Sequence, residues 1–229
     1  MQRCVGSPLN TETVKEIIDR YKTHDSFLRL IANTFGVKSE HYRQIAEAEA
    51  MITDGFAHIR RRTGEEYVEH QRSVAVIGLV YCGEKDHISV LSDLLHDSVE
   101  DTEATLALLR HKFGRLVATT VAGQTKPPFP ERGSMSISDH KELCSRLTFE
   151  HLQRYGSRSM RGKCRDRLHN MLTLWGKPDK KLDKIRETLE FMMPISIHVD
   201  YLWQELTMAT AEQLERLSVD DTEGLLSRR

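Results

Sequence analysis

The chain has 229 residues, of which 29% are charged, and its formal net charge is −1 at pH 7. This length suits one domain with a well-filled core, and the balanced charge excludes a general attraction to DNA or to membrane surfaces. The longest apolar run, residues 74–82, is far shorter than the roughly 20 residues of a membrane-spanning helix. The four cysteines are scattered and the first residues lack an apolar signal core, so we expect a cytoplasmic protein with free thiols.

Apolar residues recur at helical spacing in the first part of the chain. One stripe covers residues 14–21, with Asn10 or Thr13 as its N-cap, and it continues over residues 27–35 until Gly36 stops it. A further stripe of the same period consists of Ile45, Ala48, Ile52, Phe56 and Ile59. The pattern predicts amphipathic helices.

Residues 73–81, SVAVIGLVY, are rich in β-branched side chains and raise the alternative of a buried strand. One helical face would contain His70, Val74, Ile77 and Tyr81. Because this spacing fits a helix and Gly83 can end it, we predict a helix. Asp86 is expected to cap the next helix, over residues 88–95.

Residues 125–138, TKPPFPERGSMSIS, are the clearest break, since they hold three of the six prolines. We expect an ordered loop or a lid here. Ser138 or Asp139 should start a helix that runs to about Tyr155 and ends at Gly156.

Two later apolar stripes complete an all-α pattern. One covers residues 182–192 and ends near Pro194, and the other covers residues 202–214. We therefore divide the chain into an N-terminal helical extension (1–40), a central domain (41–200) and a C-terminal helical segment (201–229).

Residues 94–105, LLHDSVEDTEAT, begin as an apolar helix and then become strongly acidic. The acids are Asp97, Glu100, Asp101 and Glu103, and His96 precedes the first of them. Residues three and four apart share a helix face, so Asp97 should lie over Glu100 and Asp101. Such packing is unfavourable unless a cation or ordered water lies among the groups. The alternative is that the segment merely ends one helix and caps the next, around an ordinary core histidine.

Two more segments carry polar groups in a regular pattern. Asp166, Asn170 and Thr173 lie at i, i+4 and i+7 in the segment CRDRLHNMLTLWG. Three arginines precede His70 in the segment RRRTGEEYVEH. Each has an ordinary explanation by itself, as a surface stripe and as solvated cations at a helix C-terminus.

The order of these motifs resembles the hydrolase domain of the RelA/SpoT family of alarmone enzymes, which has the HD-phosphohydrolase fold. The matching stretches are RRTGEEYVEHQ, LLHDSVEDT, FGRLVATTVAGQTK, RDRLHNMLTL and ETLEFMMPIS. The resemblance covers roughly residues 45–200 and implies an all-α helical bundle of the HD type for the central domain. It leaves no room for the synthetase domain of the long bifunctional members, so the chain is similar in scope to a small stand-alone hydrolase such as the metazoan SpoT homologue.

The resemblance also implies a role for individual residues. The metal ligands would be His70, His96, Asp97 and Asp166, and the catalytic acids Glu100 and Asp101. The base of the substrate would contact Arg61, Arg62, Thr63, Asn170 and Thr173. Candidate phosphate contacts are Lys126, Lys141 and Arg161, with solvated surface charge as the alternative. Two imidazoles and two carboxylates form a donor set that suits Mn²⁺, although zinc or iron could compete.

The implied activity is hydrolysis of a nucleotide 3′-pyrophosphate, such as ppGpp to GDP or pppGpp to GTP. The expected partner is thus a small nucleotide, and neither DNA nor a membrane. The alternatives are an antitoxin-type hydrolase of ppApp or pyrophosphorylated tRNA ends, with a tRNA or toxin partner, a generic HD nucleotidase or phosphodiesterase, and a non-catalytic alarmone-binding regulator. The oligomeric state stays open.

The sequence departs from the family pattern at three positions near the motifs. Gln71 stands where the family has proline, and Phe56 aligns with a histidine of the family. Arg165 stands where the family has alanine, next to Asp166. None of the three changes the implied ligand set.

Overall fold

The computed structural model describes residues 11–61 and 64–226, with side chains described as far as residue 218. The first half contains α1 (Thr11–Tyr21), α2 (His24–Phe35), α3 (Glu40–Gly55), α4 (Tyr67–Val76), the π-helix η1 (Ile77–Tyr81), α5 (His87–Leu95), α6 (Ser98–Asp101) and α7 (Leu106–Gln124). The second half contains α8 (Ile137–Arg154), α9 (Ser157–Leu172), α10 (Pro178–Glu187), the π-helix η2 (Thr188–Met192), α11 (Met193–His198) and α12 (Trp203–Leu226). The only β-type pairing in these ranges is an isolated bridge between Arg60 and Glu66, so the all-α prediction is confirmed.

Several helix ends follow the capping chemistry that the sequence predicts. The Asp86 carboxylate accepts a hydrogen bond from the backbone N–H of Ile88 (3.1 Å) at the start of α5. Gly36 (φ 83°) and Gly156 (φ 84°) follow α2 and α8 in the left-handed region, which glycine enters without a steric penalty.

Other boundaries differ from the prediction. Thr13 lies inside α1 rather than before it, and Asn10 lies outside the described residues. The stripe expected to continue into α2 is interrupted, because the Thr23 hydroxyl accepts from the backbone N–H of Ser26 and starts a new helix.

The helix after the proline-rich loop also starts earlier than predicted. Ser136 is its N-cap, with a hydroxyl that accepts from the backbone N–H of Asp139 at 3.0 Å. Ser138 and Asp139 therefore lie inside the first turn of α8. Ser136 satisfies the same capping rule two residues upstream, and local spacing alone did not separate these polar residues.

Residues 73–81 are helical, as predicted, but the second half widens into the π-helix η1. Gly78 of η1 faces Arg165 of α9. A Cβ atom at position 78 would lie 2.9 Å from Arg165 Cδ, so the absence of a side chain allows this close approach.

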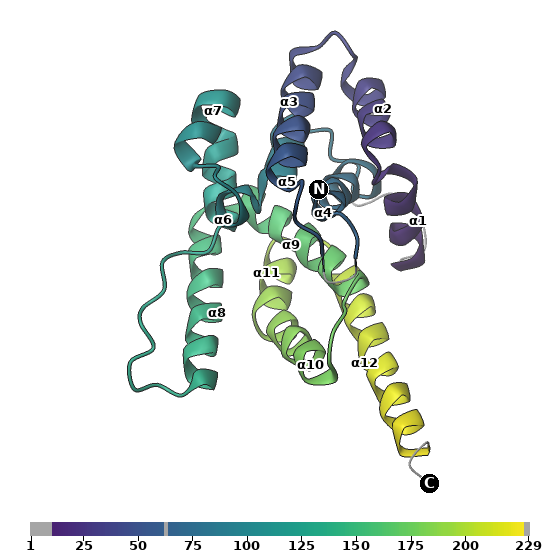
Figure 1. The fold of residues 1–229 in the computed structure, drawn as a ribbon, viewed down its shortest axis with the longest axis vertical. Coiled ribbons are helices and arrows are strands. Elements are labelled where there is room, and N and C mark those ends of the chain that lie inside the picture. The colour runs from purple at the N-terminus through teal and green to yellow at the C-terminus, as the bar shows by residue number, and fades with distance from the viewer. Residues whose placement is uncertain (1–10, 62–63, 227–229) are drawn as a thin grey trace.

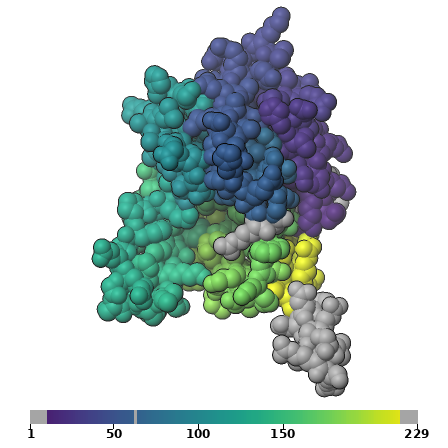
Figure 2. All heavy atoms as spheres, in the orientation of Figure 1, coloured from purple at the N-terminus to yellow at the C-terminus, as the bar shows by residue number. Residues whose placement is uncertain are grey.

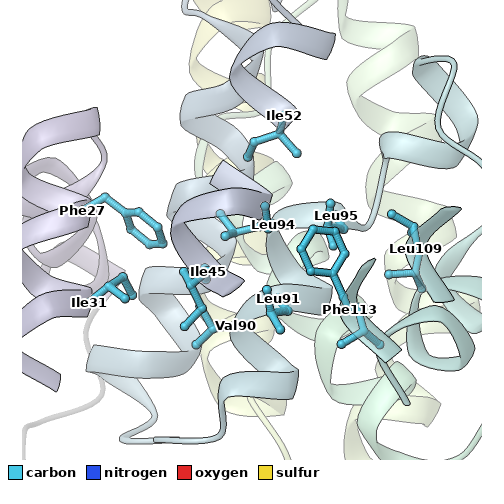
Figure 3. Close-up of a cluster of buried hydrophobic side chains, with 14 of the residues drawn as sticks. Phe27, Ile31, Ile45, Ile52, Val90, Leu91, Leu94, Leu95, Leu109 and Phe113 are labelled. Carbon is cyan, nitrogen blue, oxygen red and sulfur yellow. The ribbon is translucent and has the colours of Figure 1, made fainter. Parts of the chain in front are cut away.

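Two clusters of buried apolar side chains hold the helices together. Figure 3 shows side chains of the first cluster, which are Phe27, Ile31, Ile45, Ile52, Val90, Leu91, Leu94, Leu95, Leu109 and Phe113. The second cluster includes Val14, Ile18, Ile77, Phe149, Leu168, Met192, Ile195 and Leu206. Full burial of one such side chain is worth about 1.5–3 kcal/mol. Leu94 and Leu95 thus anchor the acidic segment that follows them to the first cluster.

Helix α9 occupies the centre of the molecule (Figure 1). It contacts α4, α5 and α7 on the side of the first cluster, and α8, α11 and α12 on the side of the second. Figure 2 shows the purple-to-blue N-terminal helices over one half of this face and the green-to-yellow C-terminal helices over the other. In the described ranges, no helix combines the length and the apolar character needed to cross a membrane.

Candidate metal centre and active site

The four predicted metal ligands come from three separate segments that meet beside α9. His70 lies on α4, His96 and Asp97 follow α5, and Asp166 lies on α9. His70 Nε2 is 3.2 Å from Asp166 Oδ1 and 3.8 Å from Asp97 Oδ2. His96 Nε2 is 3.1 Å from Asp97 Oδ2 and 3.8 Å from Asp166 Oδ1. One ligand atom each of His70, His96 and Asp97 lies within 4.8 Å of the other two, and Asp166 approaches both imidazoles from α9.

The helix that leads into this centre ends at Leu95, as predicted. Asp97 follows with φ −97° and ψ −5°, and the short α6 begins after it, so Asp97 is not in one regular helix with Glu100 and Asp101. On a regular helix, adjacent side chains point about 100° apart. The break lets the consecutive side chains of His96 and Asp97 approach the same centre.

His96 is oriented for metal binding by its other ring nitrogen. Its Nδ1 lies 2.7 Å from the carbonyl oxygen of Asp93 and donates to it, which leaves Nε2 facing the carboxylates. That Nε2 is buried and lies 3.1 Å from Asp97 Oδ2, without the geometry of a hydrogen bond. A divalent cation could bind both atoms, because imidazole nitrogens and carboxylate oxygens are common metal donors.

The charges around this centre favour ionised carboxylates. Burial raises the pKa of Asp97, but the neighbouring charge of His96 outweighs burial and holds that pKa below its usual range. Burial also raises the pKa of Asp166, and the Lys163 ammonium, 2.8 Å from Asp166 Oδ2, outweighs it in the same way.

The two imidazoles differ in protonation. Burial lowers the pKa of His70. It lowers the pKa of His96 as well, but the Asp97 carboxylate more than compensates and raises that pKa to about 9. His70 is thus neutral at pH 7, whereas a metal at this centre would have to displace a proton from His96.

We expect Mn²⁺ to stabilise the protein against heat, and more strongly at pH 8 than at pH 6. A metal at about 100 times its Kd raises the free energy of unfolding by about 2.7 kcal/mol. Since His96 must release its proton and its pKa is about 9, metal affinity should fall as the pH falls below that value. Thermal unfolding with Mn²⁺ or with a chelator, at both pH values, measures the difference. Equal melting temperatures with metal and chelator would contradict it.

A cavity of about 630 Å³ lies beside the four ligands. His70, Asp97 and Asp166 form part of its wall, together with Glu100 and Asp101. The basic residues of the wall are Arg60, Arg61, Lys126, Lys141, Lys163, Arg167 and Lys184. A ligand with several phosphate groups suits a cavity of this kind, because carboxylates can hold its metal while ammonium and guanidinium groups bind its oxygens.

The predicted catalytic acids line the cavity and have different partners. The Glu100 carboxylate accepts from the backbone N–H of Lys126 (2.7 Å) and also pairs with the Lys126 ammonium. Asp101 lies 3.1 Å from the hydroxyl of Tyr67, which is also 3.0 Å from Asp97 Oδ2. Burial and these two carboxylates raise the pKa of Tyr67, so its hydroxyl stays protonated and donates. Lys126, predicted as a phosphate contact, therefore holds Glu100.

The predicted base contacts lie next to the metal ligands. Arg61 Nη2 donates to Asn170 Oδ1 at 2.9 Å, and Asn170 Nδ2 donates to Asp166 Oδ1 at 2.5 Å. Thr173 lines the cavity, and its hydroxyl donates to a backbone carbonyl of α9. The two remaining predicted contacts, Arg62 and Thr63, lie outside the described residues.

Of the other two candidate phosphate contacts, Lys141 lies at the cavity and Arg161 lies outside it. Lys141 lines the cavity and pairs with Asp183 at 2.7 Å. Arg161 does not line it, because its side chain pairs with Glu84 and lies over the ring of Tyr201, 5.1 Å from the centroid.

Sequence reasoning missed several residues at the site, among them Tyr67, Lys163, His169 and Lys184. Lys163 lies three residues before Asp166, and Tyr67 three residues before His70, so both spacings placed them on the face of a predicted ligand. His169 is inside the motif that identified Asn170. For Tyr67 and Lys163, the helical spacing to a predicted ligand was the signal that could have found them.

Arg165 is fully buried, although it departs from the pattern of the similar family. Its guanidinium lies 2.8 Å from carboxylate oxygens of both Asp93 and Glu84, and it donates to the Tyr201 hydroxyl at 2.8 Å. Asp93 in turn holds His96 through its backbone carbonyl. The buried arginine therefore holds Asp93, and Asp93 orients the predicted metal ligand His96.

The sequence is similar to bacterial enzymes of alarmone metabolism. It is 31% identical over 158 residues to a guanosine-3′,5′-bis(diphosphate) 3′-pyrophosphohydrolase of Aquifex aeolicus, a match that covers 69% of this chain and 22% of that protein. It is 32% identical over 152 residues to the protein of the same name from Haemophilus influenzae, a match that covers 64% of this chain and 21% of that protein. A GTP pyrophosphokinase of Streptomyces coelicolor is 32% identical over 175 residues, which are 75% of this chain and 20% of that protein. The chain spans about a fifth of the length of these relatives, and no family model matches it.

A solved structure shares the fold. It is the structure of a metazoan ortholog of SpoT that hydrolyzes ppGpp and plays a role in starvation responses. The TM-score is 0.61 at 20% sequence identity, and the match covers 74% of this chain and 95% of that one. The two chains therefore share one all-α fold.

Proposed function

This chain contains a hydrolase domain of the RelA/SpoT family, and we therefore propose that it removes the 3′-pyrophosphate of guanosine alarmones. The products would be GDP from ppGpp and GTP from pppGpp, each with pyrophosphate. The observation that carries the proposal is a cavity lined by three of the four predicted ligands, two further acids and several basic side chains, with His96 directly behind Asp97. The names of the bacterial relatives support the same activity.

We assign Mn²⁺ as the cofactor, held by His70, His96, Asp97 and Asp166. The N₂O₂ donor set and the buried Nε2 of His96, which faces the Asp97 carboxylate, support this assignment. When bound, a divalent cation supplies Lewis-acid activation of a water molecule and neutralises charge on a phosphate.

The carboxylates of the cavity wall would move the protons. Hydrolysis joins a water oxygen to the phosphorus next to the ribose and breaks the bond from that phosphorus to O3′. The water loses a proton and O3′ gains one. Glu100 takes the proton and, with Asp101, returns one to O3′. Lys126 keeps Glu100 fixed for this role, and the Tyr67 hydroxyl holds Asp101 and Asp97 in place.

The substrate would be held by its base and by its phosphates. The planar guanidinium of Arg61 can stack on a purine, with Asn170 and Thr173 beside it. The ammonium groups of Lys141 and Lys184, which also line the cavity, would bind phosphate oxygens. A nucleotide bound in this way presents its 3′ arm to the metal ligands.

We expect intact pyrophosphate as the first product, with similar rates for two and for three 5′ phosphates. Phosphorus NMR of reactions with Mn²⁺ and ppGpp or pppGpp identifies the product directly. Orthophosphate as the first product, or loss of 5′ phosphates, would instead support a generic nucleotidase.

The same assay separates the other functions. Faster cleavage of ppApp or of pyrophosphorylated tRNA ends would indicate an antitoxin-type hydrolase. Tight binding of ppGpp without turnover would indicate a regulator, although a binding protein needs neither Glu100 nor Asp101 as a proton acceptor.

The described cysteines Cys82, Cys144 and Cys164 form no disulfide, which supports the cytoplasm as the compartment.

A further inference from the structure

The buried imidazole of His169 connects the cavity wall to the metal centre. Its Nδ1 lies 2.8 Å from Nδ1 of His70 and 3.0 Å from Nη1 of Arg61. The rings of His70 and His169 are 4.8 Å apart between centroids, and both residues are 3% exposed, so water does not compete for these contacts.

The donor and acceptor at each contact follow from the chemistry of arginine. A guanidinium group only donates hydrogen bonds, so Nδ1 of His169 must accept from Arg61, and the proton of that ring is on Nε2. The single lone pair of His169 Nδ1 is then shared by two donors in a three-centre hydrogen bond, and the second donor is His70, whose proton is therefore on Nδ1. His70 then presents an unprotonated Nε2 to Asp166 Oδ1 at 3.2 Å. Two facing acceptors at this distance are stable with a cation between them.

We propose that His169 is a positioning residue that fixes His70 in the tautomer able to bind a metal through Nε2. Arg61 in turn holds His169 in the tautomer that accepts a hydrogen bond from His70. The inference rests on the proposed function only in taking Arg61 as a nucleotide contact. A second path starts at the same side chain, since Arg61 Nη2 reaches Asp166 through Asn170. One arginine thus orients two of the four ligands.

This arrangement makes nucleotide and metal binding interdependent. A nucleotide that holds the Arg61 guanidinium in place also holds His169 and Asn170, and through them His70 and Asp166. By linkage, each ligand then raises the affinity for the other by the same factor. Arg61→Ala should accordingly weaken Mn²⁺ binding even without nucleotide, which a residue that only stacks on the base would not do.

The test uses the full chain and two variants of one residue. His169→Leu removes the acceptor, whereas His169→Asn keeps a carbonyl oxygen that can accept from both His70 and Arg61. Calorimetric titration with Mn²⁺, without nucleotide, should show roughly 10–100-fold weaker binding for the leucine variant, and the asparagine variant should recover most of the loss. His151→Leu is the matched control, because the ring of His151, on α8, bonds a backbone carbonyl and does not line the cavity. It should bind Mn²⁺ like the wild type.

A second measurement needs no variant and no metal. Long-range ¹H–¹⁵N spectra of the histidine rings in chelator-treated wild type should show His70 protonated on Nδ1 and His169 on Nε2. His70 protonated on Nε2, or unchanged Mn²⁺ affinity in a folded His169→Leu protein, would overturn the proposal. Neither readout involves turnover, so a protein that shows both signatures but leaves ppGpp intact refutes the proposed function and not this inference.

Discussion

Asp97→Asn should lose both bound metal and turnover, whereas Glu100→Gln should keep the metal and lose turnover alone. Asp97 Oδ2 lies within 3.1 Å and 3.8 Å of the two imidazole nitrogens, so removal of its charge takes one of only two anionic donors from the metal. Asp97 lies in the break between α5 and α6, which brings its side chain to the same centre as His96.

Glu100 is expected to behave differently because it faces Lys126. A glutamine of the same size still accepts the backbone N–H of Lys126 but takes up no proton, and loss of a general base reduces turnover roughly 10²–10⁴-fold. Metal content after gel filtration and kcat with ppGpp separate the two variants. Glu103→Gln is the control, since Glu103 is an exposed acid of the same segment outside the cavity wall. Equal metal loss in the Asp97 and Glu100 variants would refute the division of roles.

Arg165→Ala should produce the largest loss of stability among these variants. Arg165 and Asp93 are each 1% exposed, and burial raises the pKa of Asp93 to about 6 even with the arginine beside it. Removal of one partner from a buried ion pair leaves the other charge without compensation and destabilises a protein by about 3–5 kcal/mol. The backbone carbonyl of Asp93 holds His96, so metal binding should weaken as well.

Urea unfolding of the metal-free protein measures this loss. Arg158→Ala is the matched control, because the pair of Arg158 with Asp86 is largely exposed and such pairs contribute about 0–1 kcal/mol. A double variant with Arg165→Met and Asp93→Leu should recover part of the stability, since apolar groups of similar size need no charge partner. Equal losses in the Arg165→Ala and Arg158→Ala proteins would contradict the argument.

Much of the fold was readable from sequence because its determinants are local. The cap at Asp86 and the glycine at position 36 depend on neighbours within four residues, and apolar spacing was sufficient for most helices. The second half of residues 73–81 was not predictable as a π-helix. Gly78 in this π-helix packs closely against Arg165, and Arg165 lies far away in the sequence.

The sequence motifs predicted the candidate metal ligands, but they did not predict the residues that contact and orient those ligands. The identities of His70, His96, Asp97 and Asp166 came from motifs, and the structure brings these side chains together. Their individual roles remain predictions. The contacts of His169 join residues 99 and 108 positions apart in the chain, and no local pattern contains such information.

The contact between Gly78 and Arg165 has an evolutionary consequence. A side chain at position 78 would meet Arg165 Cδ at 2.9 Å, so a larger residue there requires the arginine to shift. The arginine in turn is paired with the buried acid Asp93. Three positions on three helices are therefore coupled, and we expect a larger residue at position 78 to be better tolerated after Arg165 is replaced by a smaller side chain.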